Sequence, residues 1–377
     1  MSQQVYMDHN ATSPTRPKVR DAVVRAMEAG GNPSSVHASG RKARRAVEDA
    51  REQIRTAVNA PKSAQIVFTS CGTEANTLAL TCTGRDKIWA GATDHAAVLR
   101  VADHVEIIPV DVNGLIDPFQ LDELFAGGGD DVVVSVMLAN NETGVLQQLE
   151  GIANIAHRYS ALVHTDAVQA LGKVDVDFES LGVDMMSVSA HKIGGPLGVG
   201  ALIATKDVDL TAINPGGGQE KGVRGGTENV PGIVGFGLAA EIAIAELAGM
   251  AHVKALRDTL EARILDCAPD ATVIAQLWDR LPNTSFIAMP GVDAETQVMN
   301  FDLEGIAVSA GSACASGKTK SSAVLTAMGL PADIARSAVR VSLAQTNKIE
   351  EIEHFISVWT NLYQRKNTAP NTAQSAA

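Results

Sequence analysis

His164-Thr-Asp-Ala-Val-Gln169 and Ser189-Ala-His-Lys192 are two polar motifs that each follow a short apolar run. The first comes directly after Ala161-Leu-Val163, and the second ends a run that starts with Met185-Met186. Ligands of open α/β sheets bind beyond the carboxyl ends of the strands. The two motifs therefore predict a polar site where an acid, an amide, a hydroxyl, an imidazole and an amine gather at neighbouring strand ends.

The acid and the amine of this predicted site include Asp166 and Lys192. A pyridoxal phosphate (PLP) enzyme needs both, because a lysine binds the cofactor as a Schiff base and a carboxylate keeps the pyridine nitrogen protonated. A structural ion pair at the strand ends explains the same two residues, since such pairs also perturb ionisable groups. These residues alone leave both interpretations open.

The composition is that of an ordinary globular protein. The chain has 377 residues, of which 45% are hydrophobic, and this length predicts about two domains. No apolar run approaches the roughly 20 residues that span a bilayer, and the N-terminus lacks the regions of a secretory signal. We therefore expect a cytoplasmic protein without a membrane partner. The net charge of −12 disfavours nucleic acid as a direct ligand.

A local basic cluster between Arg41 and Arg45 does not change this expectation. Ala43, Val47 and Ile54 occur there at helical spacing, which is typical of an amphipathic helix with a solvated basic face. The four cysteines are spread widely and show neither a CxxC pair nor a zinc-binding spacing. No resident metal is therefore predicted, and a reducing compartment is expected.

Short apolar runs alternate with helical patterns over residues 15–250, which predicts an α/β fold with a mostly parallel, doubly wound sheet in a large domain. Residues 1–14 and 251–364 are expected to form a smaller α+β domain, and residues 365–377 a flexible tail. The predicted strands of the large domain are 65–69, 87–90, 105–110, 132–138, 161–165, 185–189 and 201–204.

Thr69-Ser-Cys-Gly-Thr-Glu-Ala-Asn76 joins a predicted strand to a predicted helix. Exposed backbone N–H groups and the helix dipole form an anion site at such a junction. Gly72 would let the backbone approach a phosphate, and Thr73 would add a hydroxyl donor. Simple N-capping by Thr73 accounts for the same residues, so this alternative stays open.

Two consecutive amides, Asn140 and Asn141, directly follow the predicted strand that ends at Leu138. They are suited to bond the ring oxygen of a cofactor. Next to Gly144 they also match the chemistry of an Asx turn, which the sequence favours when this motif is taken alone.

Gly311-Ser-Ala-Cys314-Ala-Ser-Gly-Lys318 consists mainly of small residues and predicts an accessible thiol. Most lone cysteines are packing residues, but Cys314 lies among Gly, Ser and Lys, where a thiolate is solvated. Cys71, at the predicted start of a helix, is the rival nucleophile, because a helix start favours a thiolate. Cys82 and Cys267 lie in apolar helical contexts and are expected to pack.

Arg340 lies in Val339-Arg-Val-Ser342, a predicted strand of the small domain. If it faces a cleft, its guanidinium group would clamp a substrate carboxylate with two hydrogen bonds. On an exposed strand face it would have no such role, and the sequence alone does not decide between the two.

These motifs occur together and in one order, in which the chain resembles the NifS/IscS-type cysteine desulfurases. That group belongs to the class V aminotransferases among the fold-type I PLP enzymes. The resemblance extends from Val5 to about Leu362, and it includes Asp8-His-Asn-Ala-Thr12, Gly31-Asn-Pro-Ser-Ser-Val-His37 and Gly225-Gly-Thr-Glu-Asn229. It implies the fold-type I architecture with PLP as cofactor.

The resemblance also implies catalytic and substrate-binding residues. Lys192 would hold the cofactor covalently and move protons at the substrate Cα, and His95 would stack on the cofactor ring and help to move protons. Arg340 and Asn141 would bind the substrate. Cys314 would take the sulfur, and it would be the residue that contacts an iron–sulfur cluster during transfer.

The resemblance implies more residues for binding the cofactor than for catalysis or substrate binding. Asp166 would pair with the pyridine nitrogen, and Gln169 and Asn141 would bond the phenolic oxygen. Thr227 would reach the PLP of a partner subunit, which implies a homodimer. The full set of implied cofactor-binding residues is Gly72, Thr73, His95, Asn141, Asp166, Gln169, Ser189, His191, Lys192 and Thr227.

The implied reaction converts L-cysteine to L-alanine and leaves the sulfur as a persulfide on Cys314. A sulfur-acceptor protein, either a scaffold or a thiolation enzyme, would then use the sulfur for iron–sulfur cluster or other sulfur-cofactor synthesis. The alternative activities are those of a selenocysteine lyase or a class V aminotransferase, and transamination needs no thiol at position 314. A non-catalytic paralogue is disfavoured, because Lys192 and Cys314 are both present.

Overall fold

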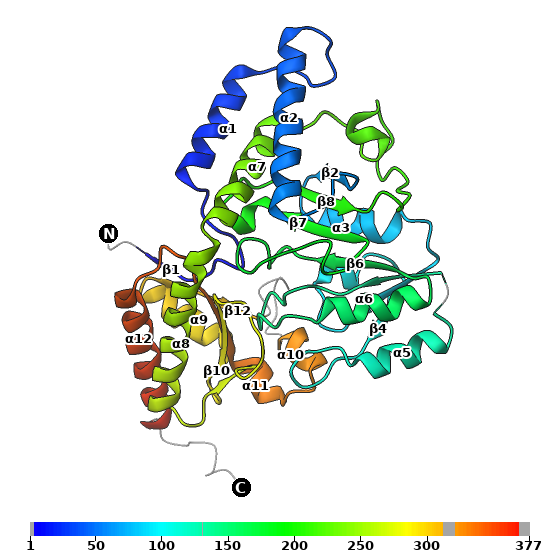
Figure 1. The fold of residues 1–377 in the computed structure, drawn as a ribbon. Coiled ribbons are helices and arrows are strands. Elements are labelled where there is room, and N and C mark those ends of the chain that lie inside the picture. Colours follow the sequence, from blue (N-terminus) through cyan, green and yellow to red (C-terminus); the bar gives the residue numbers. More distant parts are fainter. Residues whose placement is uncertain (1–3, 130, 312–320, 369–377) are drawn as a thin grey trace.

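The computed structural model describes residues 4–129, 131–311 and 321–368. Two β-sheets and one pair of short strands organise these residues, with helices packed around them (Figure 1). The larger sheet has the strand order β2-β8-β7-β6-β5-β3-β4. Its strands are β2 (Gln65–Thr69), β3 (Lys87–Gly91), β4 (Glu106–Ile108), β5 (Val132–Ser135), β6 (Leu162–Asp166), β7 (Met185–Ser189) and β8 (Gly200–Ala204).

The larger sheet is mostly parallel. Only β8 runs antiparallel to its neighbours, β7 and β2, while the other pairs are parallel. The connection from β7 to β8 spans residues 190–199, which is too short for the crossover that a parallel neighbour needs. All predicted strands of the large domain are present, and the predicted mostly parallel sheet is confirmed.

Helices cover both faces of this sheet. Val132 and Val134 of β5 belong to one apolar cluster with Val47, whereas Val133 belongs to a second cluster with Leu78 on the opposite face. This alternation shows that both faces of the sheet are buried under helices, as in a doubly wound fold. The covering helices are α1 (Pro17–Ala29), α2 (Ala38–Ala57), α3 (Gly72–Thr81), α4 (Ala96–Leu99), α5 (Pro118–Ala126), α6 (Leu149–Arg158) and α7 (Val230–Ala245).

The basic cluster of the N-terminal region lies on α2, which packs against α7 (Figure 1). Ala43, Val47 and Ile54 are buried on its inner side, and Arg41 and Arg45 are exposed. The predicted amphipathic helix with a solvated basic face is therefore confirmed.

A second, antiparallel sheet has the order β12-β13-β10-β9. Beside it, β1 (Val5–Tyr6) pairs in parallel with β11 (Ile306–Ala307), which brings the start of the chain to this part of the molecule. The sheet strands are β9 (Thr272–Val273), β10 (Thr284–Ala288), β12 (Ser309–Ala310) and β13 (Ala338–Ser342), and the helices are α8 (Met250–Cys267), α9 (Ala294–Leu303), α10 (Ala323–Ala327), α11 (Ala332–Ser337) and α12 (Ile349–Thr368).

The last helix is longer than the sequence suggests. α12 continues to Thr368, so residues 365–368 are helical where a flexible tail was expected. Lys366 ion-pairs with Asp270 at 3.2 Å, and the ring of Tyr363 lies under the Lys366 ammonium, which holds the final turn in place. The division of the chain into domains at residues 15, 250 and 364 stays a prediction, and residues 369–377 lie outside the described ranges.

The segment from Asp8 to Arg16 connects the two sheets and positions the site. His9 N–H donates to the Ser342 carbonyl at the end of β13, and Ser13 N–H donates to the His191 carbonyl just after β7. This segment therefore crosses the carboxyl ends of the larger sheet's central strands, where ligands of such sheets bind.

Within the described ranges, no single helix is long and apolar enough to cross a membrane. Only α7 and the following Leu247–Cys267 stretch meet the length and composition test, as a pair bent by 56°. Core helices meet the same test, and α7 packs against α1 and α2.

Phe301 and Phe355 lie in the apolar core that packs against the second sheet, which we call the second core. Their rings stack with centroids 4.5 Å apart, and both side chains are buried. Phe301→Ala should lower the free energy of unfolding by about 3–5 kcal/mol, because it removes buried contacts and leaves a cavity. Leu303→Ala on the same helix is the control, since Leu303 is 86% exposed. Equal urea midpoints for the two variants would contradict this packing.

Candidate active site

A cavity of about 300 Å³ lies at the carboxyl ends of β6 and β7. Thr227 does not line it and is exposed in the loop before α7. Cys314 lies outside the described residues. The predicted site residues that do line the cavity are Gly72, Thr73, His95, Asn141, Asp166, Gln169, Ser189, His191, Lys192 and Arg340.

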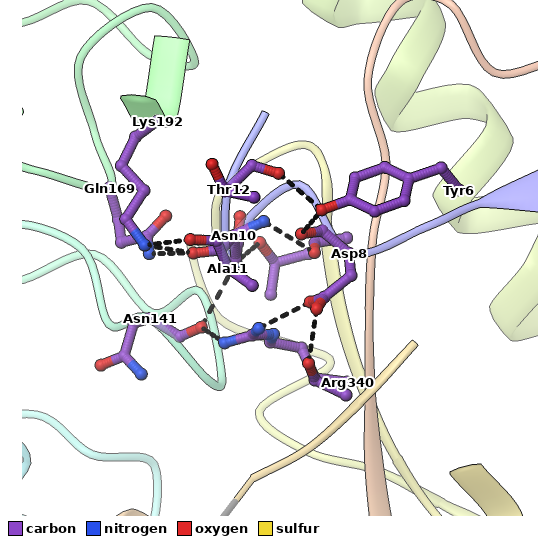
Figure 2. A network of polar contacts seen from close by, with 12 residues as sticks. Tyr6, Asp8, Asn10, Ala11, Thr12, Asn141, Gln169, Lys192 and Arg340 are labelled. Atoms are coloured by element: carbon purple, nitrogen blue, oxygen red, sulfur yellow. Dashed lines mark hydrogen bonds and ion pairs between the residues drawn. The ribbon is translucent and has the colours of Figure 1, made fainter. Parts of the chain in front are cut away.

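Lys192 projects from a single 3₁₀ turn, η1 (Ala190–Ile193), that directly follows β7. Its Nζ donates to the carbonyl oxygens of Asn10 at 2.6 Å and Ala11 at 2.8 Å (Figure 2). The N-terminal segment therefore sets the direction of the amine, which faces the cavity.

Asp166 ends β6 with a buried carboxylate whose two oxygens are both held. Asn76 Nδ2 donates to Oδ2 at 2.8 Å, and the Val168 backbone N–H donates to Oδ1 at 3.0 Å. Because these donors are neutral, the negative charge of the carboxylate stays available to a protonated group in the cavity. Asn76 lies in the Thr69–Asn76 motif, but the sequence did not predict its contact with Asp166.

The start of α3 forms an anion cradle. The helix begins at Gly72, and Cys71 as N-cap makes no side-chain hydrogen bond, so N-capping by Thr73 is not the role of this motif. A Cβ at Gly72 would meet Val168 Cγ2 at 2.8 Å, so only glycine leaves this approach open. Ser189 Oγ is buried without a partner among the described residues, next to the first turn of α3. Free helix N–H groups and an orphan hydroxyl suit a phosphate.

The two asparagines after β5 have different roles, one in an Asx turn and one at the cavity. Asn140 Oδ1 accepts from the backbone N–H groups of Glu142 and Thr143, both at 2.9 Å, which makes an Asx turn. Asn141 lines the cavity instead. The turn interpretation is therefore right for Asn140, and it presents Asn141 to the site.

Both cavity histidines are uncharged at neutral pH. Burial lowers the pKa of His95, and Lys192 lowers it further, against the effect of Asp166. Burial also lowers the pKa of His191 to about 4, with Lys192 acting in the same direction. His95 Nδ1 accepts the Ala97 N–H at 3.1 Å, which leaves its Nε2 as the protonated nitrogen.

Arg340 faces the cavity and is buried, so the exposed-face alternative is wrong. Its Nη2 donates to Asp8 Oδ1 at 2.7 Å and its Nη1 to the Asn141 carbonyl at 2.9 Å (Figure 2). Its Nε has no partner among the described residues. Asp8 also accepts from Ser309 Oγ at 2.6 Å, which ties the guanidinium to the strand before residue 312.

The other cysteines have different surroundings. Cys71 is half-buried and does not line the cavity, whereas Cys82 is buried in an apolar cluster, as expected. Cys267 packs beside the second core. In the part of the chain that the structure describes, no group of three or more His, Cys, Asp and Glu side chains could hold a metal ion.

Asp94 is a buried acid beside the site that the sequence did not single out. Its Oδ1 accepts the Met137 N–H at 3.0 Å and its Oδ2 accepts from Ser135 Oγ at 3.2 Å. Burial raises the pKa of Asp94 to about 8, and the nearby Asp166 adds to this effect. At neutral pH the Asp94 carboxyl is therefore mostly protonated. The residues next to Asp94 in the sequence do not predict that its side chain is buried.

Asp94→Asn should make stability less dependent on pH. The folded-state pKa of about 8 lies above the unfolded value of about 3.9, so the folded protein keeps a proton that the unfolded chain has lost. The contribution of Asp94 to stability therefore falls as the pH rises between these values. Relative to wild type, Asp94→Asn should gain up to about 1.4 kcal/mol per pH unit across this window, measured by urea unfolding.

Asp103→Asn is the matched control, because Asp103 is exposed. Its stability difference from wild type should not change with pH. A difference that is equally flat for Asp94→Asn would contradict a neutral Asp94.

Comparison with known proteins identifies the family. The family model described as aminotransferase class-V matches residues 5–355. A cysteine desulfurase of Cereibacter sphaeroides is 43% identical over 371 residues, which cover 94% of this chain and 95% of that protein. The cysteine desulfurase NifS of Azotobacter vinelandii is 39% identical, with 97% of this chain and 94% of that protein covered.

The fold agrees with this relationship. The X-ray structure of a NifS-like protein from Rickettsia africae superposes with a TM-score of 0.89 at 37% identity, and covers 96% of this chain and 100% of its own. The fold-type I architecture and the resemblance that the motifs predict are both confirmed. The chain therefore belongs to the class-V aminotransferase family, as one of its NifS-like members.

Proposed function

We propose that this protein is a PLP-dependent cysteine desulfurase, which converts L-cysteine to L-alanine and takes up the sulfur on Cys314. The observation that carries the proposal is the convergence of Lys192, Asp166 and the Gly72 cradle on one cavity. The desulfurases to which the chain is similar over almost its whole length support the reaction.

The polar groups of the cavity suit the phosphate, the ring nitrogen and the aldehyde of PLP. The N-terminus of α3, the open space at Gly72 and the orphan hydroxyl of Ser189 suit the phosphate. The Asp166 carboxylate suits a protonated pyridine nitrogen, and the Lys192 amine suits the aldehyde carbon. These three groups would be hard to explain together by a structural ion pair.

Bound PLP would supply an electron sink that stabilises negative charge at the substrate Cα. Asp166, held by Asn76 and Val168, would keep the ring nitrogen protonated for this purpose. Lys192 would hold the cofactor through its amine and would move the proton at the substrate Cα. The carbonyl oxygens of Asn10 and Ala11 aim that amine.

Arg340 would bind the substrate carboxylate. Its buried and unpartnered Nε is a donor that needs an acceptor, and a carboxylate provides one. Asp8 fixes the guanidinium plane from the other side, so the arginine does not have to reorganise when the substrate enters. The neutral His95 offers a second site for proton movement.

Cys314 would accept the sulfur. L-cysteine and the enzyme thiol become L-alanine and the enzyme persulfide, so that a C–S bond breaks, an S–S bond forms and no outside oxidant is needed. Ser309, Ala310 and Gly311, which lead to this residue along the chain, line the cavity, which supports a place for Cys314 in the reaction.

We also infer a homodimer in which Thr227 reaches the PLP of the partner subunit. The exposure of Thr227 outside its own chain's cavity is in accord with such a contact. A sulfur-acceptor protein in the cytoplasm, serving iron–sulfur or other sulfur-cofactor synthesis, would then receive the persulfide sulfur.

Reduction of the PLP-loaded protein with borohydride should fix the cofactor covalently on Lys192. Lys192→Ala should carry no covalent label, because Lys192 is the only lysine among the described residues that line the cavity. Mass spectrometry of the digested protein measures this. A label on the buried Lys173 instead would contradict the assignment.

Cys314→Ala should lower sulfide release from L-cysteine under reductant by on the order of a hundredfold or more, because it removes the attacking nucleophile. The absorbance of bound PLP should stay unchanged. Cys71→Ala is the control and should keep its activity, since Cys71 does not line the cavity. Wild-type sulfide release from Cys314→Ala would rule out the persulfide and favour a lyase.

A further inference from the structure

Lys173 is a buried lysine that the proposed reaction does not use. It lies in the turn after β6 and does not line the cavity that holds Asp166, but it lines a neighbouring cavity of about 410 Å³, which Lys192 lines as well. Its Nζ donates to Gln169 Oε1 at 2.6 Å and to Asn10 Oδ1 at 2.9 Å. Among the described residues, Lys173 therefore hydrogen-bonds to the site through these two amides.

The surroundings of Lys173 favour a neutral amine. Both of its hydrogen-bond acceptors are uncharged amide oxygens, and a neutral amine has two N–H groups to match them. Burial, Lys192 and Arg340 lower the pKa of Lys173 well below its usual value. The titratable side chains that face Lys173 include His9 and His191, and burial lowers the pKa of each to about 4.

Lys173 decides which way the Gln169 amide points. Gln169 Oε1 accepts from Lys173, and Gln169 Nε2 donates to the Asn10 carbonyl at 2.9 Å. The flipped amide would set its oxygen against the Asn10 carbonyl, and it would leave the two N–H groups of Lys173 with Asn10 Oδ1 as their one acceptor in this network. Only the observed orientation satisfies all four groups, and it leaves the second N–H of Nε2 for the cavity that Gln169 lines.

We infer that Lys173 is a positioning residue that locks the Gln169 amide so that it presents an N–H donor to the phenolic oxygen of PLP. The inference rests on the proposed function, because it concerns the same cofactor. A donor at that oxygen stabilises its negative charge and so lowers the pH at which the lysine-linked cofactor gives up its proton.

The test is the pH titration of the visible absorbance of PLP bound to the full-length protein. Lys173→Met should raise the apparent pKa of bound PLP by about one unit, because one hydrogen bond has about that net worth. Lys62→Met is the control and should leave the titration unchanged, since Lys62 is exposed and far along the chain from this network.

A double-mutant cycle separates positioning from a direct charge effect. In a Gln169→Leu background, Lys173→Met should cause no further shift, because the amide on which Lys173 acts is gone. An equal shift in both backgrounds would overturn the inference, and so would an unchanged titration of Lys173→Met. If Lys173→Met does not fold, Lys173→Gln is taken through the same cycle and judged by the same two outcomes.

The PLP titration also distinguishes a failure of this inference from a failure of the proposed function. A wild-type protein that takes up no PLP would overturn the proposed function and the inference together. A wild-type titration of bound PLP that both Lys173 variants leave unchanged would overturn the inference alone.

Discussion

Asn10 is the buried residue through which both halves of the site are held. Its backbone carbonyl accepts from Lys192 Nζ and Gln169 Nε2, and its Oδ1 accepts from Lys173 Nζ and Asn283 Nδ2. Its own Nδ2 donates to Thr284 Oγ1 at 2.9 Å, at the start of β10 (Figure 2 shows part of this network). One side chain thus joins the carboxyl ends of the larger sheet to the second sheet.

This arrangement is specific because its members are polar and all of them except Lys192 are buried. A buried donor or acceptor without a partner costs about 1–3 kcal/mol, so the network has few alternative arrangements. The consequence is preorganisation: the protein's own hydrogen bonds aim the Lys192 amine, the Gln169 amide and the Arg340 guanidinium at the cavity. Burial also raises the pKa of Asp94 to about 8 and lowers the pKa of His191 to about 4, which favours the uncharged form of both side chains.

The sequence predicts the fold and most of the cavity lining, because both follow from local patterns. Alternating apolar runs locate the strands, and polar motifs directly after strands locate Asp166, Asn141 and Lys192. It does not reveal the roles of Asp94 and Lys173, since these depend on burial and on partners that only the folded chain brings near. Asn10 lies in the Asp8–Thr12 motif that carries the family resemblance. The sequence could not show its role, because its hydrogen bonds join residues up to 332 positions apart.

A crystal structure of the protein with bound PLP would show directly whether Lys192, Asp166 and the start of α3 hold the cofactor. We expect continuous density from Lys192 Nζ to the cofactor, the pyridine nitrogen within hydrogen-bond distance of Asp166, and the phosphate at the N-terminus of α3. We also expect Gln169 beside the phenolic oxygen, with Lys173 still bound to its Oε1. A cofactor attached to another lysine, or a ring nitrogen turned away from Asp166, would show that this cavity does not bind PLP as proposed.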